Sequence, residues 1–90
     1  MTRYTIRYRC ITPTGQTSLI VEDEQGAAHI FSNGRLHAQI TSADASTRLA
    51  QLLTGSSACM PVPRVSPYTL DGLRRLTDAP RQYEHAHGGR

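Results

Sequence analysis

Residues 3–11 read RYTIRYRCI, and this stretch decides the expected fold. Its even positions are Tyr4, Ile6, Tyr8 and Cys10, and its odd positions include Arg3, Arg7 and Arg9. A period of two is typical of a β-strand with one buried face and one face in water, and aromatic and β-branched residues favour strands. We therefore expect a strand over 3–11, with the tyrosines turned inward and the arginines turned outward.

Three further strands are expected at 17–22, 27–32 and 35–40, because turn residues separate these apolar runs. Asn33-Gly34 is typical of a two-residue hairpin, and it pairs Ser32 with Arg35 and Phe31 with Leu36. The same register places His29 opposite Ala38 and on the face of Phe31. A histidine fits poorly there if that face is the core, and a bulge in this strand would remove the conflict.

Helical patterns follow the strands. Apolar residues at helical spacing predict a helix over 43–54, and Ser66-Pro67 followed by spaced leucines predicts a second helix over 67–77. The prolines within 59–63 favour an extended loop between the two helices. The expected class is α+β, with a small antiparallel β-meander of about four strands followed by one or two short C-terminal helices.

Ninety residues suffice for one domain and are too few for two. Residues 1–80 form the expected domain, and the polar residues 81–90 form an expected flexible tail. Charged residues make up only 19% of the chain, which is low for a disordered protein. Neither a membrane-spanning run nor a signal-peptide core occurs, so we expect a cytoplasmic protein. Two cysteines do not resemble a disulfide framework, and the sequence leaves their redox state open.

The net charge is +3, and all ten basic residues are arginines. Alternate residues of a strand lie about 6.8 Å apart on one face, so Arg7 and Arg9 could grip neighbouring phosphates. The predicted surface for a nucleic acid or an acidic partner consists of Arg3, Arg7, Arg9, Arg35, Arg74 and Arg75. The arginines can equally reflect a coding bias toward this residue, or form a solvated face whose charges prevent edge-to-edge pairing of strands.

Catalytic and metal-binding patterns are weak. The hairpin register points His29 and His37 to opposite faces, so they cannot share a metal. A weaker third hypothesis combines His85 and His87 with a cysteine. No nucleophile elbow or phosphate-binding loop occurs, and the acidic run at 22–24 fits turn chemistry. The sequence therefore predicts neither an enzyme nor a cofactor.

More apolar side chains occur than one sheet face can bury. Ile20 and Ile30 fall on the face opposite the expected core, and Tyr68 adds to this surplus. Either a partner chain or the C-terminal helix can cover such a face. We therefore expect a non-catalytic interaction protein (a subunit, adaptor or inhibitor) that docks on a protein partner or on itself. Docking would use a sheet face or edge and an arginine-bearing surface. The alternative is a nucleic-acid-binding module that uses the arginines of the first strand.

Overall fold

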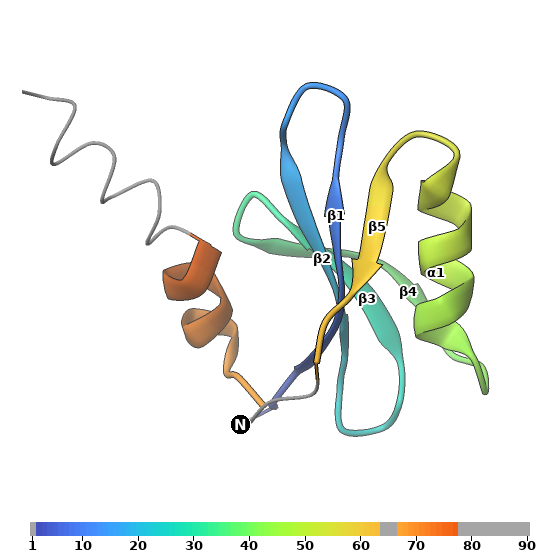
Figure 1. Cartoon of the computed structure of the whole chain (residues 1–90). Coiled ribbons are helices and arrows are strands. Elements are labelled where there is room, and N and C mark those ends of the chain that lie inside the picture. Colours follow the sequence, from blue (N-terminus) through green and yellow to red (C-terminus); the bar gives the residue numbers. More distant parts are fainter. Residues whose placement is uncertain (1, 64–66, 78–90) are drawn as a thin grey trace, which may run out of the picture.

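The computed structural model describes residues 2–63 and 67–77, which form an antiparallel five-stranded sheet with one helix on each face (Figure 1). The strand order is β4-β3-β2-β1-β5. The elements are β1 (Thr5–Ile11), β2 (Thr17–Glu22), β3 (Ala28–Ser32), β4 (Arg35–Ile40), α1 (Ala45–Thr54), β5 (Ala58–Pro61) and the helical residues 70–77. The predicted α+β class and the four-stranded meander are confirmed.

The fifth strand differs from the sequence-based prediction of a loop. Ala58–Pro61 pairs with β1, and Cys59 lies directly opposite Cys10. The segment is short and lacks a period of two, so its pairing with a strand far away in sequence leaves no local signal. The expected tail at 81–90 lies outside the described residues.

The Asn33-Gly34 turn is confirmed. Both residues have positive φ, 54° for Asn33 and 76° for Gly34, as the hairpin turn of this length requires. Ser32 and Arg35 are paired beside the turn, as the sequence predicts. This local signal is reliable because few residues other than glycine and asparagine adopt such backbone angles at low energetic cost.

A bulge changes the register further along the same hairpin. Ile30 pairs with His37, but His29 pairs with Gln39 and not with Ala38. The extra residue therefore lies in β4, and it moves Ile40 onto the face that packs against α1. His29 keeps its place on the other face and is partly buried.

The alternation in β1 breaks at Arg7. Ile6 and Tyr8 pair with successive residues of β2, which leaves Arg7 as the extra residue of a bulge. One inserted residue reverses the facing of every later position. The prediction that the even-numbered residues share one face is therefore wrong: Tyr4 and Ile6 pack on one side, and Tyr8 and Cys10 pack on the other.

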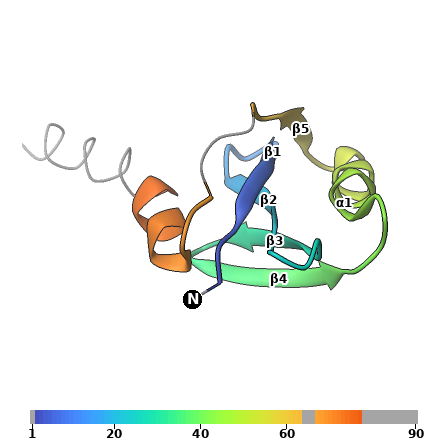
Figure 2. The same ribbon diagram turned by 90° about the horizontal axis from the view of Figure 1, so that it is seen from below.

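Each face of the sheet has its own apolar core, and the two helices cover opposite faces (Figure 2). The buried residues of the α1 core are Cys10, Ile20, Ala28, Ala45, Leu49 and Ala50. Those of the second core are Ile6, Leu19, Val21, Phe31 and Leu73. A sheet with apolar residues on both faces needs a layer on each side, and both layers come from this chain.

The second helix begins later than the sequence predicts. Tyr68 forms an isolated bridge with Tyr4, in which each backbone N–H donates to the other residue's carbonyl. Thr69 precedes the helix, and its Oγ1 accepts a hydrogen bond of 3.0 Å from the N–H of Gly72. Thr69 thus caps a helix start that the sequence analysis assigns to Ser66-Pro67. Residue 66 itself lies outside the described residues.

Candidate functional site

The predicted arginine row does not form one surface. Arg7 lies on the α1 side of the sheet, and its Nη1 is 2.8 Å from Oε2 of Glu22, the β2 residue that also contacts Ser46 of α1. Arg9 pairs with Leu19 and with Met60. Directly paired residues of neighbouring strands share a face, and Leu19 belongs to the second core, so Arg9 lies on the face away from α1. The bulge at Arg7 therefore separates the two guanidinium groups. Arg3 is exposed and precedes the strand.

Glu22 links three elements, a role that the turn interpretation of residues 22–24 misses. Besides the ion pair with Arg7, its Oε2 accepts a hydrogen bond of 2.6 Å from Ser46 Oγ. Ser46 is buried on α1, with 2% of its surface exposed. The carboxylate therefore joins β1, β2 and α1, and Arg7 takes part in this contact.

Arg74 contacts the β3–β4 turn next to Arg35. Arg74 Nε donates a 2.9 Å hydrogen bond to the carbonyl of Gly34, which is next to Arg35 in the chain. Arg74 Nη1 also lies 3.2 Å from Asp71 Oδ1. Arg35 and Arg75 are exposed. The predicted six-residue arginine site is thus distributed over separate parts of the molecule.

The three predicted interface residues belong to the two cores. Ile20 has no exposed surface, and Ile30 packs against the same α1 core. Tyr68 packs against the core on the other face. The face expected to await a partner is covered by α1 of this same chain, so Ile20 cannot form a docking surface. This face needed a second layer, as the sequence indicates, and an intramolecular helix supplies it.

Asp23 and His29 form the most enclosed polar pair. Asp23 Oδ2 lies 3.0 Å from His29 Nε2, and their side chains are 11% and 13% exposed. The other carboxylate oxygen accepts the backbone N–H groups of Gln25 and Ala27. The ring of Tyr4 meets the imidazole edge-on, with centroids 6.0 Å apart. The contacts of this pair are with the backbone of the β2–β3 turn and with the ring of Tyr4, so we assign it a structural role.

The pKa of Asp23 reflects these contacts. Burial disfavours the charged carboxylate and acts to raise the pKa. The hydrogen bonds from His29, Ala27 and Gln25, together with the charge of His29, outweigh burial and lower the pKa below its ordinary value.

Cys10 and Cys59 are joined by a disulfide, so neither is a free thiol. A nucleophilic or metal-binding cysteine must be a thiolate, and this bond removes both candidates. Within residues 2–63 and 67–77, no cluster of three or more histidine, cysteine or acidic residues could hold a metal ion. His85 and His87 lie outside those ranges.

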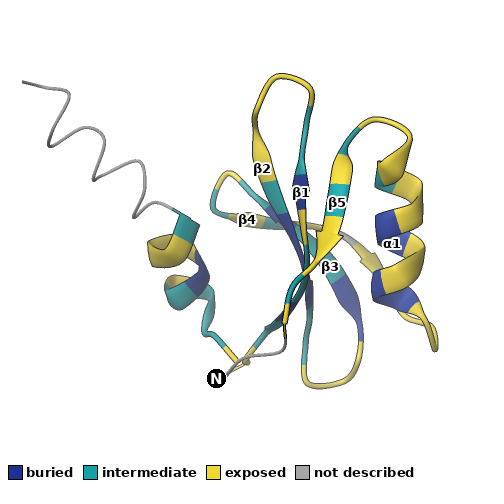
Figure 3. Ribbon diagram, in the orientation of Figure 1, coloured by how far each residue is buried: buried dark blue, intermediate teal, exposed yellow. Residues whose placement is uncertain are grey.

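A mostly apolar strip that includes Arg9 remains exposed. It lines a depression of about 100 Å³, and we call it the Met60 ledge. Its residues are Arg9, Ile11, Met60, Pro61, Val62 and Pro63. Met60 is 64% exposed, and Figure 3 shows that most of β5 is open to solvent. Leu52 on α1 and Leu76 are also exposed, but neither of them lines the Met60 ledge.

Both edges of the sheet are poor templates for another strand. At the β5 edge, Pro61 and Pro63 have no N–H to donate. At the β4 edge, the bulge disturbs the regular spacing of outward N–H and C=O groups. Strand addition is therefore disfavoured at both edges, and the side chains of the Met60 ledge are the better docking candidates.

Comparisons with protein-family models, with curated proteins and with solved structures found no match to this chain. In the part of the chain that the structure describes, no helix is long and apolar enough to cross a membrane.

Proposed function

We propose that this chain is a non-catalytic interaction module that binds a protein partner through the Met60 ledge. The observation that supports the proposal is an exposed methionine beside an exposed arginine, on an apolar strip that neither helix covers. Methionine adapts its shape to irregular partner surfaces, and both methionine and arginine are enriched in protein interfaces.

The charge of Arg9 indicates the chemistry of the partner. Ion pairs among the described residues join Arg7 to Glu22, His29 to Asp23 and Arg74 to Asp71, and none of them includes Arg9. A partner that places a carboxylate over Arg9 and an apolar side chain against Met60 would satisfy both. Such an arginine near an apolar anchor is a common energetic centre of interfaces.

The size of the depression supports a single anchoring side chain. Pockets for small ligands and cofactors have volumes of about 300–1,000 Å³, and the depression beside Arg9 has about 100 Å³. At the Met60 ledge, this favours contact with a side chain of a protein partner over binding of a small molecule.

The nucleic-acid alternative loses the geometry on which it is based. It requires Arg7 and Arg9 side by side on one face, and the bulge places them on opposite faces. A phosphate-binding surface would also show a steep salt dependence that weakens when Arg9 is removed.

Cytoplasmic location is part of the same proposal and bears on the disulfide. Cytosolic thiol reductants break disulfides that oxidising compartments preserve. In the cytoplasm, the redox state of Cys10 and Cys59 would therefore depend on the local supply of thiol reductants.

The test uses a photo-crosslinking amino acid at position 60 and, as the matched control, at position 52. Both sites replace an exposed apolar side chain, so they differ in location and not in exposure. We expect a discrete protein adduct from position 60 in the native host and none from position 52. Equal labelling from both positions, or none from position 60, contradicts the proposed surface.

The identified partner then permits a binding measurement. Arg9→Glu should raise Kd at least tenfold, since losing a charged contact at an interface centre costs about 1.4 kcal/mol or more. Arg48→Glu changes an exposed arginine of α1 and is the matched charge control. Equal effects of the two substitutions would show that only the overall charge matters.

A further inference from the structure

β5 carries part of the Met60 ledge, yet little apolar burial holds it in place. It pairs with β1 over four residues, and no strand lies on its other side in the described sheet. Ala58, Met60 and Pro61 are exposed, so Cys59 is the only β5 side chain that packs into a core. A short edge strand of this kind gains little from burial to offset the entropy of ordering it.

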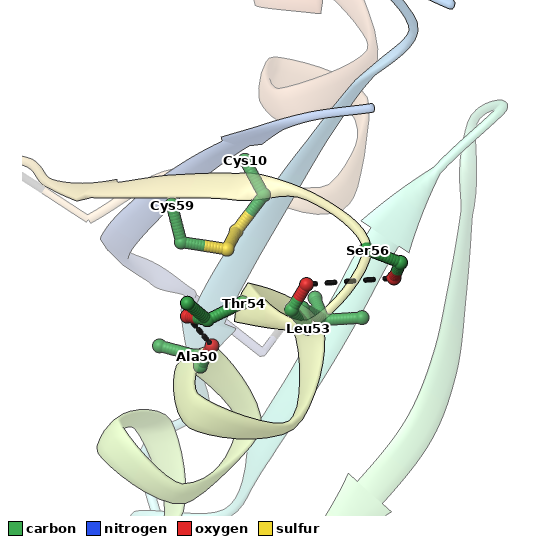
Figure 4. Close-up of a disulfide and its surroundings, with 6 residues drawn as sticks. All are labelled: Cys10, Ala50, Leu53, Thr54, Ser56 and Cys59. Carbon is green, nitrogen blue, oxygen red and sulfur yellow. Dashed lines mark hydrogen bonds between the residues drawn. A yellow bond between two sulfur atoms is a disulfide. The ribbon is translucent and has the colours of Figure 1, made fainter. Parts of the chain in front are cut away.

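The disulfide is the strongest tether of β5. Cys10 is 1% exposed and belongs to the α1 core, so the bond attaches the edge strand to the well-packed interior of the molecule. Figure 4 shows it beside the last turn of α1, near Leu53 and Thr54. Its sequence separation is 49 residues, so the bond joins two strands that are far apart in the sequence.

The contacts that remain without the bond are mostly backbone hydrogen bonds. They include the ladder to β1, the hydrogen bond of 3.0 Å from the N–H of Val62 to the carbonyl of Arg7, and those from the N–H groups of Ser56 and Ser57 to the carbonyl of Leu53. Apolar contact is limited to the partial burial of Val62 and the packing of β5 against α1 around Cys59. Val62 holds the chain beyond β5, whereas Met60 lies between it and the disulfide. Met60 thus lies between two points of attachment, the disulfide at Cys59 and the hydrogen bond at Val62.

We propose that the Met60 ledge forms only in the oxidised chain, so that reduction of Cys10–Cys59 by a dithiol switches the docking surface off. This inference rests on the proposed function of the ledge. Cys59 is the point of attack, because it is the less buried residue of the two and Cys10 is 1% exposed.

The exchange is balanced in two steps. A thiolate of the dithiol attacks Cys59 Sγ, the Cys10–Cys59 bond breaks, and Cys10 leaves as a thiolate that takes up a proton. The second thiol of the reductant then loses its proton and attacks its own mixed-disulfide sulfur, releasing Cys59 as a thiolate that is protonated in turn. The protein disulfide gains two electrons and two protons, and the dithiol becomes a cyclic disulfide.

Amide hydrogen exchange of the full chain tests the switch without any partner. The probes are the N–H groups of Ala58 and Met60, which the antiparallel register directs toward β1, compared in the oxidised protein and in the protein treated with dithiothreitol. The amides of β2, at the centre of the sheet, report whether the rest of the fold persists. We expect reduction to accelerate exchange in β5 at least tenfold more than in β2, because a loss of global stability affects both strands whereas local release affects β5 alone.

A double variant separates the bond from other effects of the reductant. Cys10→Ser combined with Cys59→Ser should show the fast β5 exchange with or without dithiothreitol. Unchanged β5 protection in the reduced protein overturns the inference. An equal acceleration in β2 and β5 overturns it as well, because the bond would then stabilise the whole fold and not the ledge in particular.

Crosslinking from position 60 in both redox states separates this inference from the proposed function. An adduct in the oxidised chain that falls at least tenfold on reduction supports both. An adduct that persists after reduction overturns the redox control alone. Absence of an adduct from the oxidised chain refutes the docking function, whatever the exchange data give.

Discussion

Replacing Leu73 with alanine tests whether the second helix covers its face of the sheet. Leu73 is fully buried and belongs to the core that contains Val21 and Phe31. Leucine-to-alanine changes at buried sites cost about 2.7–5 kcal/mol, and the cost is lower where the surroundings can close the cavity. One wall of this site is a short helix that can move toward the sheet, so we expect a loss of about 3 kcal/mol.

Leu76 supplies the control within the same helix. It is 42% exposed, so Leu76→Ala removes the same atoms and changes helix propensity equally, but loses about 1 kcal/mol or less. The difference of about 2 kcal/mol isolates burial. With a urea m-value of about 1 kcal/mol/M, it separates the two unfolding midpoints by about 2 M in circular dichroism. Midpoints that coincide, or a Leu73→Ala loss below about 1 kcal/mol, would refute the packing of this helix against the sheet.

Three further predictions concern the polar and covalent contacts. Reducing Cys10–Cys59 should lower the free energy of unfolding by up to about 4 kcal/mol, which is the chain-entropy value for a separation of 49 residues. A urea midpoint that is the same with and without dithiothreitol would contradict this. The pKa of Asp23 is lowered from 3.8 in the folded chain, so its carboxylate stabilises the fold above pH 3.8, and this contribution is lost as the pH falls through the folded pKa. Asp23→Asn should therefore flatten the acid limb of stability against pH, and an unchanged slope argues against the shift. Glu22→Gln should cost about 1 kcal/mol by weakening the contacts to β1 and α1, whereas Glu24→Gln in the exposed turn should be neutral within error in thermal unfolding.

The candidate site was only partly predictable from the sequence. Arg9 was among the predicted binding residues and contributes to the Met60 ledge. Met60 was not, because an isolated methionine between a cysteine and a proline carries no periodic signal. Its pairing with Arg9 depends on β5, which has no local sequence signature. The separation of Arg7 from Arg9 was hidden for a similar reason, since the bulge between them has no fixed residue requirement.

The sequence by itself determined what local physics controls: the alternation that makes 3–11 a strand, the Asn33-Gly34 turn, and the helical spacing of the leucines. Backbone preferences and side-chain periods act within a few residues, so these features can be read along the chain. Only the tertiary structure decided which face each side chain takes beyond Arg7, that α1 and residues 70–77 cover opposite faces, and that Cys59 meets Cys10. Each of these depends on contacts between distant segments, and one extra residue in a strand exchanges the two faces of everything that follows.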